Sequence, residues 1–242
     1  MLLIGLDAAS KWTNFGYAIG QCESGIIEVE EAGLVQSPTE SDALANRIAP
    51  RLRDLEHALV AVDAPLGWPR ALALALKEHC AGEPIEVGKD ALFRRATDRA
   101  VARLTGRFPL EVGADRIART AYSALQMLGM LRQMTNKPIP LAWSPDFTGV
   151  AAIEVYPAGT LRARQLPHSK YKDVDASLVR QEIAQRLAKE VQALERYVAG
   201  RADVFDACLC LVAAKDFIEG RALPPQDLEL AQREGWIWVR AG

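Results

Sequence analysis

The chain has 242 residues, of which half are hydrophobic and a quarter are charged. This composition is typical of a globular protein that can bury a large core. The formal net charge of -2 excludes an overall electrostatic attraction to nucleic acid, so contact with a polyanion would need a local basic surface or bound metal ions.

The four cysteines and three histidines lack the spacing of a redox pair or a zinc site. No apolar stretch approaches the roughly 20 residues that span a bilayer, and the apolar run that opens the sequence is too short for a signal peptide. We therefore expect a cytoplasmic protein with no membrane partner.

The first part of the sequence predicts three strands. The apolar run Met1–Leu6 leads to an acid and is typical of a buried strand, and further strands are predicted at about 15–20 and 26–35. Strands so close along the chain pair in antiparallel fashion, because a parallel partner needs a longer crossover connection.

A helix and a long helical segment are predicted next. Asp42 is the expected N-cap of an amphipathic helix, which leads to a fourth strand that ends at Asp63 and lies parallel to the first. We interpret residues 68–148 as a helical insertion in a single domain that spans residues 1–242. Its clearest helices are expected at about 90–104 and 114–134.

The remainder of the sequence predicts a strand at 150–155 and then a mobile basic loop at 167–172. A long amphipathic helix is expected from Asp175 or Ser177 to about residue 194. A last helix is expected from Asp203 to about residue 219, followed by a tail that forms an edge strand or a docking segment.

Five acidic side chains are placed where they can meet. Asp7, Asp63 and Glu154 each follow a short apolar run, and Asp203 and Asp206 lie three residues apart on one helix face. At an effective dielectric constant of about 20, two like charges about 4 Å apart repel by roughly 4 kcal/mol. Such a cluster takes up protons or binds cations. Oxygen ligands suit Mg²⁺ or Mn²⁺, so the sequence predicts one of these ions here.

Four of these acids have a structural alternative. Asp7 could cap the turn that follows it, and Asp63 precedes an Ala-Pro turn where aspartate is common. Asp203 suits a helix N-cap, and Glu154 suits an outward strand position.

Three basic residues are candidates for binding substrate. Lys11 follows the first strand closely, and Arg95 and Arg99 offer donors for a substrate phosphate. A solvated helix with surface ion pairs is the alternative for the two arginines.

The order of the predicted elements resembles the ribonuclease H-like fold. The segment Asp203-Val204-Phe205-Asp206-Ala207 is similar to the last helix of the Holliday-junction resolvases in that fold. The resemblance implies a mixed sheet of three antiparallel strands followed by parallel strands, flanked by helices. It also implies that Asp7, Asp63, Asp203 and Asp206 bind catalytic metals. The aspartate at position 63 is a departure, because resolvases of this fold usually carry glutamate there.

The sequence is more similar to a bacterial and archaeal family of predicted nucleases, domain-of-unknown-function family 429. Five segments carry this similarity: Gly5–Asp7, Val62–Gly67, Arg95–Asp98, Glu154–Pro157 and Asp203–Ala207. The similarity implies a metal-dependent nuclease that hydrolyses phosphodiester bonds in nucleic acid, DNA or RNA, with Asp7, Asp63 and Asp206 as catalytic residues. In such a site two ions about 4 Å apart clamp the attacking and leaving oxygens.

Two other functions remain open from the sequence. An actin-like-fold phosphotransferase also opens with a Gly-x-Asp strand, although the glycine-rich nucleotide turn and second large domain of that class are not visible here. A catalytically silent ribonuclease H-like module would keep the fold and bind neither Mg²⁺ nor Mn²⁺. The sequence does not specify an oligomeric state.

Overall fold

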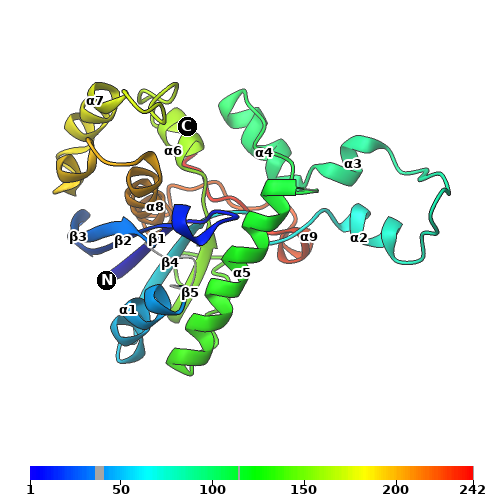
Figure 1. The fold of residues 1–242 in the computed structure, drawn as a ribbon, viewed down its shortest axis with the longest axis horizontal. Coiled ribbons are helices and arrows are strands. Elements are labelled where there is room, and N and C mark those ends of the chain that lie inside the picture. Colours follow the sequence, from blue (N-terminus) through cyan, green and yellow to red (C-terminus); the bar gives the residue numbers. More distant parts are fainter. Residues whose placement is uncertain (36–40, 114, 242) are drawn as a thin grey trace.

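The computed structural model describes residues 1–35, 41–113 and 115–241, and its centre is one mixed sheet (Figure 1). Within these residues the sheet has six strands in the order β5-β4-β1-β2-β3-β6. The strands are β1 (Leu2–Asp7), β2 (Gly16–Glu23), β3 (Ile26–Leu34), β4 (His57–Asp63), β5 (Gly149–Glu154) and β6 (Val191–Gln192). β1, β2 and β3 are antiparallel, whereas β4 is parallel to both β1 and β5. This is the predicted ribonuclease H-like arrangement, and the predicted fold class is confirmed.

Helices flank the sheet, and four of those in the described residues, α2 to α5, lie in the segment between β4 and β5. The helices are α1 (Ser41–Arg53), α2 (Arg70–Leu76), α3 (Lys89–Phe93), α4 (Ala96–Thr105), α5 (Asp115–Thr135), α6 (Pro157–Ala163), α7 (Ser177–Leu187), α8 (Ala202–Ile218) and α9 (Leu228–Glu234), with short 3-10 helices η1 (Trp12–Asn14) and η2 (Leu194–Tyr197). Figure 1 shows the stretch with α2 and α3 extending away from the sheet. In the part of the chain that the structure describes, no helix is long and apolar enough to cross a membrane.

Alternation along β1 divides the core between the two faces of the sheet. Leu2, Ile4 and Leu6 belong to a buried cluster with α1 and α5, whereas Leu3 belongs to a second cluster with α8. Successive side chains of a strand point to opposite faces, so Asp7 has the parity of the α8 face. β1 is apolar at nearly every position because both of its faces are covered.

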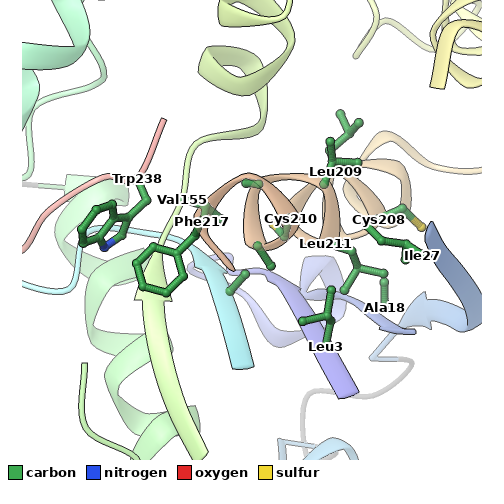
Figure 2. Packing of buried hydrophobic residues seen from close by; sticks show 14 of the residues in the cluster. Leu3, Ala18, Ile27, Val155, Cys208, Leu209, Cys210, Leu211, Phe217 and Trp238 are labelled. Atoms are coloured by element: carbon green, nitrogen blue, oxygen red, sulfur yellow. The ribbon is translucent and has the colours of Figure 1, made fainter. Parts of the chain in front are cut away.

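Helix α8 is buried on every side and fills the second core. Figure 2 shows Cys210 and Leu211 of this helix packed above Leu3 of β1. At the end of the helix, Phe217 meets Trp238 edge to face with ring centroids 4.6 Å apart. A helix that is hydrophobic all round belongs in a core, and this one brings its acidic first turns onto the sheet.

Two glycines let the start of α8 approach the strands closely. A Cβ atom at Gly5 would lie 2.1 Å from the backbone oxygen of Ala207, and one at Gly16 would lie 2.2 Å from the backbone oxygen of Asp203. Neither separation is sterically possible, so a side chain at either position would push the helix away. The distance between Asp7 and the acids of α8 therefore depends on these glycines.

The prediction of one continuous helix at 90–104 is wrong. It is interrupted between α3 and α4, where Arg95 has an extended backbone with φ -75° and ψ 165°. The side chain of Asp98 accepts a hydrogen bond of 2.8 Å from the backbone N–H of Arg95 and thereby caps α4. The predicted helix at 114–134 is observed as α5, although Ala114 itself lies outside the described residues.

The ends of two other predicted helices are corrected, and one of the two alternatives for the C-terminal tail is observed. The helix expected to reach residue 194 ends at Leu187, and the chain then forms β6 beside β3 before Ala193 adopts a left-handed conformation with φ 65°. The C-terminal tail is the predicted docking segment, because the backbone N–H of Trp238 donates to the backbone oxygen of Glu154. Asp42 lies in the first turn of α1, which begins at Ser41.

Candidate metal centre

Three carboxylates converge where the two central parallel strands end. Asp7 and Asp63 are the last residues of β1 and β4, and they are direct partners in the register of this pair. Asp206 reaches the same face from the second turn of α8. One carboxylate oxygen from each residue can be chosen so that all three lie within 4.8 Å of one another.

Burial dominates the electrostatics of this centre. It raises the pKa of Asp7 well above its ordinary value, and the charges of Asp206 and Asp63 raise it further. Burial also raises the pKa of Asp63 to about 7 and raises that of Asp206, although the ammonium of Lys172 opposes both shifts. The centre therefore favours either bound protons or a bound cation.

A lysine from a distant loop provides the positive charge that is present. Nζ of Lys172 forms an ion pair with Oδ2 of Asp206, while the lysine side chain stays half exposed. Burial lowers the pKa of Lys172, but the surrounding charges of Asp206, Asp63 and Asp7 outweigh this and raise it. Lys172 is therefore a stable ammonium at neutral pH.

Arg180 of α7 holds the loop that carries Lys172. Its side chain is 2% exposed, and it donates hydrogen bonds to the backbone oxygens of Tyr171 at 2.8 Å and Val198 at 2.7 Å. The segment predicted as a mobile basic loop is therefore attached to the core, with Tyr171 1% exposed. Lys172 and Tyr171 were absent from the predicted site residues, because only a tertiary contact connects this loop with α8.

The three converging carboxylates test whether these residues fit a metal ion. Oδ1 of Asp206 and the hydroxyl group of Tyr171 are buried, and neither forms a hydrogen bond of standard geometry among the described residues. The Tyr171 hydroxyl nevertheless lies close enough to Asp206 to lower the pKa of that carboxyl as a hydrogen-bond donor, so the convergence of three acids, and not an unsatisfied oxygen, indicates a cation here. The donor set is oxygen only, which matches Mg²⁺ or Mn²⁺. Asp7, Asp63 and Asp206 are the residues that would hold the ion.

Glu154, another predicted ligand, is used differently in this structure. It follows Ile153, which lies in the α8 core, so strand alternation directs Glu154 to the opposite face from Asp63. There Arg95 donates to both of its carboxylate oxygens at 2.8 and 3.0 Å, and the backbone N–H of Leu66 donates to Oε2 at 3.0 Å. The carboxylate of Glu154 is therefore occupied by a buried ion pair with Arg95, and it is not a ligand in the group with Asp7, Asp63 and Asp206.

Arg95, predicted to bind substrate, is the centre of that ion pair. Its side chain is 1% exposed and also binds Asp98 at 3.0 Å, and Nη1 donates to the backbone oxygen of Glu234 at 3.2 Å. Burial lowers the pKa of Arg95, and the charges of Glu154 and Asp98 overcome this effect and raise it. A phosphate would have to displace both carboxylates to reach this guanidinium.

The three remaining predicted residues are outside the group of three carboxylates. Asp203 is outside the three-carboxylate group and pairs with Arg201 at 2.6 Å, although its charge still raises the pKa of Asp7. Lys11 is exposed just beyond the end of β1. Arg99 is half-buried on α4 and donates to the backbone oxygen of Arg94 at 2.9 Å.

A cavity of about 230 Å³ opens directly onto Asp7 and Asp63. Its walls combine the strand ends with residues of the helical segment and of the C-terminal tail. They include Pro65, Pro109, Leu110, Ile117, Thr120, Tyr156, Lys172 and Ile237. The carboxylates are therefore accessible from one partly apolar cavity.

These observations define the class of the protein. It is an α/β protein with a ribonuclease H-like arrangement of its sheet and a cluster of three carboxylates at the ends of the central strands. A family model described as "Protein of unknown function (DUF429)" matches residues 7–229. The chain therefore belongs to this family, as its sequence motifs predict. No curated protein matches the chain.

Proposed function

We propose that this protein is a nuclease that uses Mg²⁺ or Mn²⁺ to hydrolyse phosphodiester bonds in nucleic acid. The observation that carries the proposal is the convergence of Asp7, Asp63 and Asp206, with ligand oxygens within 4.8 Å of one another. A purely structural cluster of this kind would be unfavourable, because like charges in a buried site repel.

Each part of the chain would have a distinct role. The carboxylates of Asp7, Asp63 and Asp206 would hold the ion, which when bound supplies a Lewis acid for the phosphoryl oxygen and lowers the pKa of water. Lys172 lines the same cavity, and its ammonium would contact an oxygen of the substrate phosphate. The half-exposed position of its side chain allows it to face both Asp206 and a substrate.

Titration with Mn²⁺ tests this proposal. Calorimetry of the wild-type protein should show binding at millimolar Mn²⁺ or below, and Asp206→Asn should lose it while its circular dichroism spectrum stays unchanged. Asp146→Asn is the control, because Asp146 is an exposed acid outside the cluster. Cleavage of labelled oligonucleotides should require the metal and should be lost in Asp7→Asn.

Two results would count against the proposal. A wild-type protein that does not bind millimolar Mn²⁺ would be the catalytically silent module. Metal binding that survives in Asp206→Asn would place the ion elsewhere, and the carboxylate cluster would lose its assigned role.

A further inference from the structure

The cavity beside the carboxylates has three kinds of surface. Asp7 and Asp63 form an acidic end, and Lys172 adds a cation next to it. Apart from the Arg95–Glu154 ion pair, the rest of the lining is mainly apolar and includes Pro65 and Tyr156. A ligand that fits this cavity must therefore combine a metal-binding anionic group with a flat or apolar part.

The size of the cavity restricts that ligand. A volume of about 230 Å³ corresponds to a cube roughly 6 Å on a side, which is below the usual range of drug-sized pockets. The major groove of B-form DNA alone is about 12 Å wide, so a duplex cannot enter. A single nucleotide unit taken out of a helix is of the right order of size.

The apolar walls suit a nucleobase. Tyr156 is half-buried at the N-terminus of α6, and its side chain lines the cavity. Burial raises the pKa of its phenol, and the nearby charge of Asp63 raises it further. Aromatic side chains bind successive bases by stacking, with little dependence on sequence. Leu110 also lines the cavity and is 72% exposed, so its side chain is free to contact a ligand there.

Three arginines lie near residues that line the cavity. Arg107 lies close enough to Tyr156 to lower the pKa of its phenol. Arg116 and Arg119 are exposed on α5 beside the wall residues Ile117 and Thr120. Among the described residues, no ion pair involves any of these three arginines. They offer the local positive charge that a strand backbone needs in a protein with a net charge of -2.

From these features we infer that the cavity binds one unpaired nucleotide of a nucleic acid strand. Its phosphate lies at Asp7 and Asp63, its base lies against Tyr156 and Leu110, and the flanking backbone follows the arginines. This inference rests on the proposed function, since it assigns the substrate of the same carboxylate site. Single strands, flaps and unpaired ends are then the substrates, and continuous duplexes are excluded.

Binding without turnover tests the inference. Fluorescence anisotropy in Ca²⁺ should show that a short fluorescein-labelled single strand binds at least about tenfold more tightly than a blunt duplex of the same sequence. Tyr156→Ala should weaken single-strand binding by about tenfold or more. That residue also packs on Gly159, so Leu110→Glu provides a second variant that leaves the core intact.

Leu178→Glu is the matched control, because Leu178 is 77% exposed on α7 and does not line the cavity. Leu110→Glu should weaken single-strand binding by about tenfold, while Leu178→Glu should leave it unchanged. Equal affinity for single strand and duplex, no measurable binding of the single strand, or an unchanged Leu110→Glu variant would each overturn the assignment. Loss of the proposed metal site would instead appear in the Mn²⁺ titration, so the two failures are distinguishable.

Discussion

Replacing Arg95 with methionine should severely destabilise the fold. Methionine keeps the apolar volume of the side chain and removes the guanidinium, which leaves Glu154 and Asp98 buried without their shared cation. Breaking a buried pair from one side costs about 3–5 kcal/mol. For a chain of this size each kcal/mol lowers Tm by about 2–4 °C, so the expected fall in Tm is roughly 6–20 °C.

Urea unfolding followed by circular dichroism measures this effect. Arg103→Met is the control, because Arg103 is exposed on the same helix as Asp98, and its change should stay within about 0.5 kcal/mol. Adding Glu154→Gln to Arg95→Met should restore part of the lost stability, since it removes one of the two unpaired charges. If Arg95→Met were as stable as Arg103→Met, the buried ion pair would not support the fold, and Arg95 would again be a candidate for binding a phosphate.

Three further predictions concern the carboxylates and the helix that brings one of them to the sheet. In metal-free protein, the pKa of Asp63 is raised from 3.8 to about 7, so the folded protein binds this proton more tightly than the unfolded chain does. The resulting contribution to the free energy of unfolding is complete below pH 4, and about 4 kcal/mol of it is lost as the pH rises through 7. Urea titrations in EDTA should show this loss and a flatter profile for Asp63→Asn, and stability that rises over the same window would contradict the assignment. Lys172→Met should bind Mn²⁺ about tenfold more tightly in calorimetry, because a positive charge that competes with the metal ion for the carboxylates is removed. The same variant should bind single strands more weakly. Unchanged Mn²⁺ affinity would show that the Lys172–Asp206 ion pair does not compete with the metal. Gly5→Ala should lose about 1–3 kcal/mol or more of stability and weaken Mn²⁺ binding, whereas Gly129→Ala, where a Cβ meets nothing within 4 Å, should be neutral or slightly stabilising.

The sheet was predictable because the physical signals that define it are local. The apolar runs that end at Asp7 and Asp63 are strands whose two faces are both covered. The first three strands follow one another closely along the chain, and this short spacing dictates that they pair in antiparallel fashion. The same argument brings Asp7 and Asp63 to one edge, since parallel neighbours end together. Asp206 was predictable from its position in the first turns of an apolar helix.

The surroundings of the carboxylates depend on contacts that are distant in sequence. The register of β5 on β4 decides on which face of the sheet Glu154 lies, and a shift of one residue would place its side chain on the other face. The helix break at Arg95 follows from Glu154 and from the backbone of Glu234, to which the guanidinium is bonded. Lys172 reaches Asp206 only because Arg180 holds its loop from α7. None of these partners is visible in the local sequence.

The two glycine contacts of α8 have a consequence for protein synthesis. Asp7 and Asp206 are separated by 199 positions (206 − 7). The strands that end at Asp7 and Asp63 carry only two of the three carboxylates, so the proposed metal site cannot form until the segment with Asp206 has been synthesised and has packed onto those strands.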